Sequence, residues 1–145
     1  SSTDKKITFS NTIKNLNVLD YNYYFKLIDY FLSEKTSESL LLFNEILNKG
    51  FDGQHFINGL SSHMRDLLMC KDNSTAELLE VSNDIKDKYK EQANNCDIDF
   101  LYNALRLTNE VDLNYKQSKN KRLLVELTLI RLCQLNNPEK KKMIL

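Results

Sequence analysis

The sequence predicts an all-α protein, and three features of its composition carry that prediction. Leu occurs 24 times among the 145 residues, whereas Val and Ile together occur only 13 times. Leu keeps most of its rotamer freedom in a helix, whereas β-branched residues lose theirs. The three Gly and one Pro are too few for the turns of a many-stranded β protein. Because this length is usual for one domain, we expect a single compact domain of about six helices.

The first helices follow from apolar residues that recur every three or four positions. Residues 7–18 predict a short connecting helix that Ser10 caps. A longer helix is expected over residues 21–33 and another over residues 37–48. Gly50 then stands where a glycine often ends a helix.

The fourth helix has the clearest pattern. Asp52 is the expected cap and residues 53–70 the expected helix. His63 lies beside its apolar stripe, at the boundary with solvent. Gly59 costs about 1 kcal/mol relative to Ala inside a helix, so a close helix crossing at this position would explain it.

The middle of the chain is more polar. Ser74 and Glu77 have the spacing of a capping box and predict a short helix that ends at Leu79. Residues 82–92 are rich in charge and predict a solvated helix with Ile85 and Tyr89 as its only apolar anchors.

Two further helices are expected over residues 99–115 and 121–135. The last one is apolar almost all the way round, which indicates burial on most sides. In a domain of this size, either it is the central helix or another subunit covers one of its sides. Pro138 ends the ordered part, and residues 137–145 form a basic tail.

Composition and motifs exclude several classes of function. The formal net charge is zero, whereas a dedicated duplex DNA binder normally carries a basic excess. No apolar run is long enough to span a bilayer, and the polar start is not a signal peptide. Cys70, Cys96 and Cys133 have no metal-binding spacing and fit a reducing cytosol as small hydrophobic residues. Phosphate-loop and catalytic-elbow motifs are absent, so we expect no cofactor, metal or catalytic residue in this chain.

Two charged or titratable residues lie on apolar faces. His63 is either a hydrogen-bonded core or interface histidine or part of a small catalytic pair with Asp66, three residues later on the same helix. Arg131 needs an anionic or carbonyl partner, either Glu110 or Asp112 within the chain or a group on another subunit.

A nucleic-acid-binding module is the alternative reading of the sequence. Tyr23 and Tyr30 lie seven residues apart on a helix flank and could stack bases, although tyrosines at this spacing are far more often half-buried packing residues. Four basic residues also gather at the turn before the last helix and could contact phosphates. They are Lys116, Lys119, Lys121 and Arg122.

Three segments resemble the third domain of the gamma/tau subunits of the bacterial DNA polymerase III clamp loader. Residues 15–21 (NLNVLDY) lead into 24–27 (YFKL), and residues 49–56 (KGFDGQHF) lead into 60–68 (LSSHMRDLL). The stretch from 117–120 (QSKN) to residue 135 resembles the last helix of that domain. The resemblance covers about residues 7–135 and includes no catalytic motif.

The resemblance implies a non-catalytic collar domain that holds clamp-loader subunits together. Its implied partners are other gamma/tau copies and the delta and delta-prime subunits, in the bacterial cytoplasm. ATP and Mg²⁺ would bind to an ATPase module outside this chain. Residues 1–18 would connect to a preceding lid domain and residues 19–136 would form the collar domain. The expected residues of subunit contact are Phe100, Leu107, Leu123, Leu127, Ile130 and Arg131.

Overall fold

The computed structural model describes residues 20–137, and within this range it contains six long helices, one short helix and no strand. The helices are α2 (Tyr21–Leu32), α3 (Thr36–Asn48), α4 (Gly53–Met69), α5 (Asn73–Ala76), α6 (Asn83–Asn94), α7 (Ile98–Asn114) and α8 (Lys121–Gln134). The prediction of an all-α domain is therefore confirmed. The expected connecting helix and basic tail lie outside the described residues, apart from Asn137.

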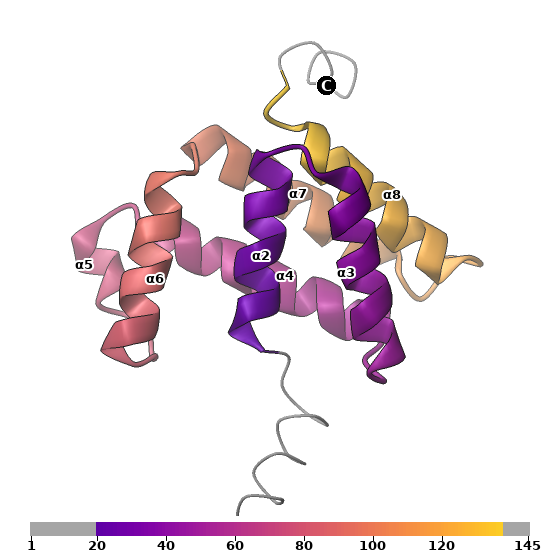
Figure 1. Ribbon diagram of the computed structural model, residues 1–145, viewed down its shortest axis with the longest axis horizontal. Helices are drawn as coiled ribbons and strands as arrows, with labels where there is room; N and C mark the ends of the chain where they lie inside the picture. The colour runs from indigo at the N-terminus through magenta and orange to yellow at the C-terminus, as the bar shows by residue number, and fades with distance from the viewer. Residues whose placement is uncertain (1–19, 138–145) are drawn as a thin grey trace, which may run out of the picture.

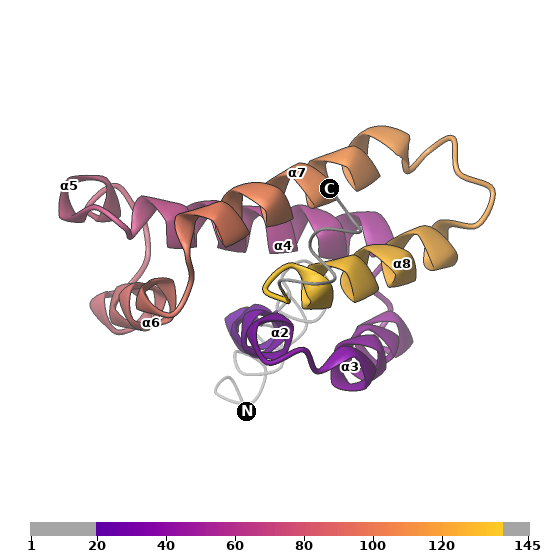
Figure 2. The same cartoon turned by 90° about the horizontal axis from the view of Figure 1, so that it is seen from above.

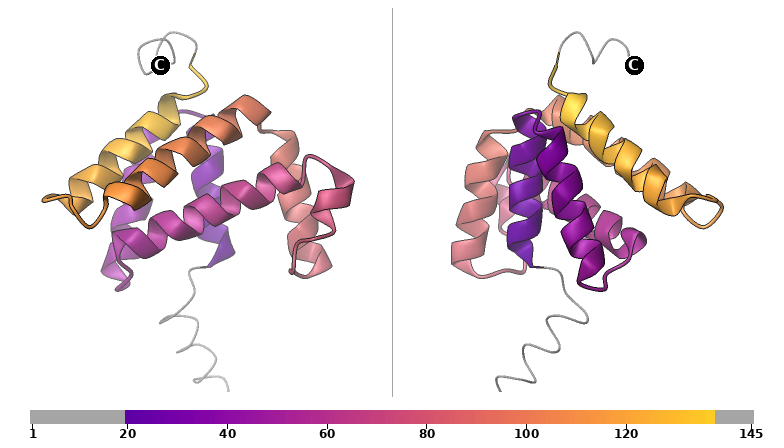
Figure 3. Two further views of the ribbon diagram at one scale, coloured as in Figure 1. Left: turned by 180° about the vertical axis from the view of Figure 1, so that it is seen from behind. Right: turned by 45° about the vertical axis from the view of Figure 1, so that its right-hand side comes forward.

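The helices form two layers (Figure 1). The upright helices α2, α3 and α6 make the front layer, and α4, α7 and α8 cross behind them (Figures 1 and 3). Helix α7 packs mainly on α4, whereas α8 packs on α7, α2 and α3. Seen from above, α7 follows the edge of the molecule and α8 lies between α7 and the front layer (Figure 2).

Local sequence explains where most helices begin and end. The Asp20 carboxylate accepts from the backbone N–H of Asn22, and the Asp52 carboxylate accepts from that of His55 at 2.7 Å. Both caps satisfy donors that a helix start leaves without a partner. Gly50 has a φ of 98°, which is the left-handed conformation expected after a helix.

Two expectations about the middle of the chain are wrong. The cap of α5 is Asp72, which accepts from the N–H and the hydroxyl of Ser74, so Ser74 does not form the predicted capping box. Helix α6 has more anchors than the two that the sequence suggested. Gln92 and Ala93 are buried together with Tyr89, because they face α4 and α2.

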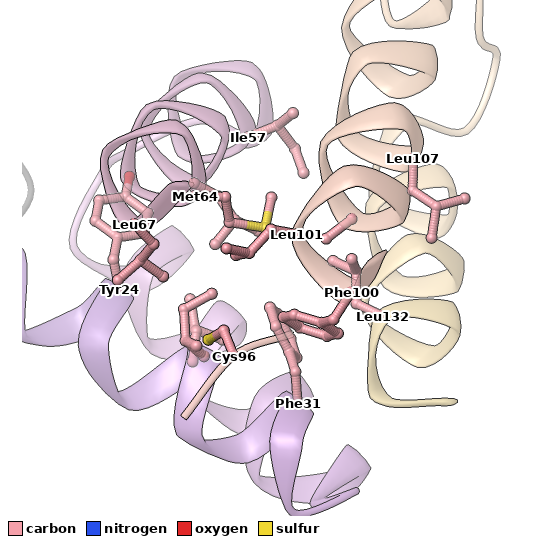
Figure 4. Close-up of a cluster of buried hydrophobic side chains, with 14 of the residues drawn as sticks. Tyr24, Phe31, Ile57, Met64, Leu67, Cys96, Phe100, Leu101, Leu107 and Leu132 are labelled. Atoms are coloured by element: carbon pink, nitrogen blue, oxygen red, sulfur yellow. The ribbon is translucent and has the colours of Figure 1, made fainter. Parts of the chain in front are cut away.

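The core fills the space between the two layers (Figure 4). It includes Phe31 from the front layer, Met64 and Leu101 from the back layer, and Leu132 from α8, all of them at 0% exposure. Tyr24 lies against Gly59 so closely that a Cβ at Gly59 would overlap its phenol group. The space at Gly59 is therefore filled by the Tyr24 side chain, rather than by the close helix crossing that the sequence suggested.

A helix that crosses a membrane must be both long and apolar. Among residues 20–137, no helix is both long enough and apolar enough to cross a bilayer.

Candidate subunit interface

Helix α8 has one buried face and one exposed apolar face. Val125, Leu129 and Leu132 are fully buried in the core. On the opposite side, Leu123 and Leu127 are 47% and 50% exposed, and their spacing of four residues places them one turn apart. Ile130 continues this line and is partly exposed. Helix α8 therefore has a buried side and an outer side, and residues 20–137 cover the apolar residues of the outer side only in part.

Polar side chains border this line of apolar residues, which we call the α8 stripe (Leu123, Leu127 and Ile130). On the flank that faces α3, Arg122 Nε lies 3.2 Å from Glu126 Oε2, and Arg122 Nη2 donates to Asn44 Oδ1 at 2.9 Å. Arg131 lies on the other flank and is exposed. An apolar centre with a polar rim is the usual anatomy of a protein–protein interface.

Arg131 does not make the internal ion pair that the sequence suggested. Among the described residues, neither Glu110 nor Asp112 lies within ion-pair distance of its guanidinium group. An exposed guanidinium keeps its hydration and needs no internal partner. Its pairing with another subunit stays a prediction.

Two of the six expected contact residues lie in the core instead. Phe100 is 2% exposed and Leu107 is 3% exposed, so both side chains are buried within the domain. They cannot meet a second protein while this fold is intact. The candidate interface is therefore narrowed to the α8 stripe and Arg131.

His63 is a structural histidine at 2% exposure. Its Nε2 lies 2.9 Å from Gln92 Oε1, while Gln92 Nε2 donates to the Phe25 carbonyl at 2.8 Å and to Asp29 Oδ1 at 3.0 Å. The Phe25 carbonyl and the Asp29 carboxylate can only accept, so the amide nitrogen of Gln92 must face them and its oxygen must face His63. An amide oxygen can only accept, so His63 Nε2 is the donor to Gln92. Burial lowers the pKa of His63 to about 4, against the opposing effect of the Gln92 hydrogen bond.

The proposed catalytic pair of His63 and Asp66 is not formed. Asp66 accepts from Arg65 Nη2 at 3.0 Å, and aromatic rings surround the His63 ring, with the Phe25 centroid at 4.6 Å and that of Tyr89 at 4.8 Å. No group of His, Cys, Asp and Glu side chains in the described part of the chain could hold a metal ion.

The three cysteines behave as small hydrophobic residues. Cys70, Cys96 and Cys133 are buried free thiols. Burial raises the pKa of the Cys96 thiol to about 11, and it also raises the pKa of Cys70 and Cys133. A thiol with a raised pKa forms little of the nucleophilic thiolate, so these positions do not suggest reactive sites.

Three of the six residues that suggested nucleic-acid binding have structural explanations. Tyr23 is half-buried, and its hydroxyl accepts a hydrogen bond from the Lys49 ammonium group. The Lys49 Nζ lies 4.9 Å from the centroid of the Tyr23 ring. Lys121 donates to the Ser118 carbonyl at 3.0 Å, and Arg122 is held by Glu126. Two of the four basic residues therefore already bond to neighbouring groups of the same chain.

The sequence analysis did not identify one buried polar residue and one pair of exposed apolar residues. Gln92 joins three helices, but a polar residue in a charge-rich segment gives no sign of burial. Ile98 and Tyr102 are 50% and 63% exposed on the outer side of α7. Their spacing of four residues was a usable signal, because the two residues share one helix face.

Comparisons with known proteins agree with this architecture. The family model described as DNA polymerase III subunits gamma and tau domain III matches residues 12–145. The solved structure of the Bacillus subtilis DNA clamp loader delta protein (YqeN) superposes with a TM-score of 0.70 at 23% sequence identity. The match covers 86% of this chain but only 40% of the delta protein, and no curated protein sequence matches. The fold is thus of the clamp-loader collar type, and the chain belongs to the family of DNA polymerase III gamma and tau domain III.

Proposed function

We propose that this domain is a collar domain, which joins clamp-loader subunits through the exposed face of α8. The observation that carries the proposal is the α8 stripe, with two leucines about half exposed inside a polar rim on a member of this family. Burying the stripe against another subunit would remove its apolar surface from water, at roughly 25 cal/mol per Å². Arg131 at the edge of the stripe would pair with a carboxylate of the neighbour.

The proposed role is one of assembly, without catalysis by this chain. The implied partners are other gamma/tau copies and the delta and delta-prime subunits, in the bacterial cytoplasm during DNA replication. ATP and Mg²⁺ would act in an ATPase module of the parent subunit. The buried thiols and the His63–Gln92 hydrogen bond are consistent with a domain that supplies packing surfaces and no reactive groups.

The interface is tested by weakening the α8 stripe. We expect the chain, mixed with the delta and delta-prime subunits of the same organism, to form species heavier than any component in sedimentation velocity. The double substitution Leu123→Ser and Leu127→Ser should weaken that association by about tenfold or more, since the few residues that dominate an interface lie near its centre and each cost more than about 1 kcal/mol when truncated.

The control is Leu78→Ser, which changes a leucine of 66% exposure in the connection after α5, away from α8 (Figure 1). It should associate like the wild type, and circular dichroism should show the same helicity for all three chains. If the wild type forms no heavier species with either subunit, the collar role is wrong. Equal association of the α8 double variant would remove this face from the interface.

A further inference from the structure

The outer side of α3 is acidic and exposes one large apolar residue. Leu41 is 69% exposed, and Glu38 and Glu45 lie three residues before it and four residues after it, so the three side chains share one side of the helix. Helix α3 contains no basic residue, and Glu34 adds a carboxylate just before its start, beside Lys35. We call this surface the α3 acidic face (Glu34, Glu38, Leu41 and Glu45). Within residues 20–137, neither Glu38 nor Glu45 has an ion-pair partner. An exposed leucine among carboxylates suits a partner that carries both positive charges and apolar side chains.

Asn137, the last residue that the structure describes, lies against the start of this face. Its Nδ2 donates to Glu34 Oε1 at 3.0 Å. Helix α8 packs on α2 and α3, and its last turn lies beside the connection between these two helices (Figures 1 and 3). The residues that follow Asn137 therefore start next to the α3 acidic face.

Residues 138–145 have the complementary composition. Their sequence is PEKKKMIL, in which three lysines (140–142) follow a single glutamate and precede three apolar residues (143–145). The α3 acidic face has the same order, since Glu38 precedes Leu41 by about one helical turn. Opposite charges and apolar side chains therefore meet in register when the segment and α3 run in the same direction.

The segment is long enough for this match. An extended chain spans about 3.3–3.6 Å per residue, so the six residues from Asn137 to Met143 reach up to about 20 Å. Leu41 lies only about 7.5 Å along the helix axis from Thr36, the first residue of α3. Exposed ion pairs contribute little by themselves, but a covalent link holds the segment at a high effective concentration, so a weak contact is enough for docking.

We infer that residues 138–145 dock on the α3 acidic face of their own chain. Their lysines pair with Glu34 and Glu38, and their apolar residues cover Leu41. The docked segment ties the end of α8 to α3 and removes the exposed leucine from water. This contact uses neither the α8 stripe nor a second subunit, so its failure would leave the proposed function intact.

The exposure of position 41 tests the inference. In Leu41→Cys, the rate at which iodoacetamide alkylates the new thiol reports how often this position is uncovered, whereas the three native thiols are buried. Replacing the apolar residues of the segment in that chain (Met143→Ser, Ile144→Ser and Leu145→Ser) should raise the rate at least about fivefold, which corresponds to about 1 kcal/mol. These three substitutions change no charge, so they do not alter the electrostatic environment of the thiol.

Salt tests the contribution of the lysines. Raising the NaCl concentration from about 0.05 M to about 0.5 M screens exposed charges, so alkylation of Leu41→Cys should accelerate by about twofold or more. The chain with the three serine substitutions should respond less, because its segment is already released. An equal response of both chains would contradict the proposed ion pairs.

Leu78→Cys is the matched control, because Leu78 is 66% exposed and lies in the connection after α5, away from α3 (Figure 1). The serine substitutions should leave its alkylation rate unchanged, and circular dichroism should show the same helicity for all chains. If they also leave the rate at position 41 unchanged, residues 138–145 do not cover α3 and the inference is wrong. Equal acceleration at both positions would indicate a general loosening of the domain and would also contradict it. Protection of position 41 that grows with protein concentration would assign the cover to a second copy instead.

Discussion

Tyr24 and Gly59 show how a single position sets the distance between two helices. The Tyr24 ring lies on α4 where Gly59 has no side chain, and its hydroxyl donates to the Phe56 carbonyl at 3.3 Å. The ring also stacks on Phe56, with centroids 6.1 Å apart. Gly59 lies within a regular helix, so its backbone conformation does not require glycine. The position requires glycine because a side chain there would overlap Tyr24.

We predict that Gly59→Ala destabilises the protein by about 1–3 kcal/mol, because the added methyl group overpacks against Tyr24. The helix preference alone has the opposite sign, since Ala is favoured over Gly by about 1 kcal/mol inside a helix. Urea denaturation of both chains measures the difference.

Tyr24→Ala provides the matched background for this substitution. Once the ring is removed, adding Gly59→Ala should raise stability, because only the helix preference remains. A gain in stability from Gly59→Ala in the presence of Tyr24 would contradict the packing explanation.

At the scale of elements, α6 depends on few contacts for its place. Tyr89 and Ala93 are its buried apolar anchors, and Gln92 adds hydrogen bonds to α2 and α4. A helix with few apolar anchors opens locally at a lower free energy than the central helices do. We therefore expect α6 to be the least protected of the long helices.

Gln92→Leu should loosen α6 more than any other long helix. The substitution leaves the His63 donor and the Phe25 carbonyl without this partner, at a cost of about 1–3 kcal/mol. Amide hydrogen exchange should accelerate in α6 and remain close to wild type in α8. Gln117→Leu, at an exposed position, is the control. Equal acceleration in every helix would show that α6 does not open separately.

The long helices were predictable because their periodicity and caps agree. Asp20, Asp52 and Ser82 all cap where the sequence placed a helix start. The start of α5 was not predictable in this way, because Asp72 and Ser74 are both good caps, and Asp72 accepts from the backbone N–H and from the hydroxyl of Ser74. Local sequence does not decide between two neighbouring caps.

The face that α8 presents was also beyond sequence reasoning. When a helix is apolar on nearly every side, its sequence does not indicate which face is buried. Only the packing of α8 against α2, α3 and α7 shows that Leu129 is buried and Leu127 is exposed. On α7 the sequence analysis expected Phe100 and Leu107 at a subunit contact, whereas the structure buries both of them.

For the whole molecule, zero net charge results from segregated charges rather than from their absence. Helix α7 carries three carboxylates and one guanidinium group, whereas α8 carries three cationic groups and one carboxylate. A formal sum of charges hides such a separation between helices.

The global stability of the domain should fall in mild acid because of His63. Its pKa is about 4 in the folded protein, against 6.5 as the ordinary value. The unfolded chain therefore takes up a proton as the pH falls below 6.5, whereas the folded chain does so only near 4. Stability is fully present above 6.5 and is lost as the pH falls to 4, by about 2 kcal/mol at pH 5 and about 3 kcal/mol in total.

Urea denaturation at about pH 7 and about pH 5 measures this loss, with His63→Gln as the comparison. The variant should be less stable at pH 7, because it loses the ring packing against Phe25 and Tyr89. Between the two pH values it should lose about 2 kcal/mol less than the wild type. Burial raises the pKa of Asp66, which acts in the opposite direction, but both chains contain Asp66 and its effect cancels in the comparison. If both chains lost the same free energy of unfolding between the two pH values, the prediction would be wrong. The folded protein would then protonate His63 without cost despite its burial beside three aromatic rings.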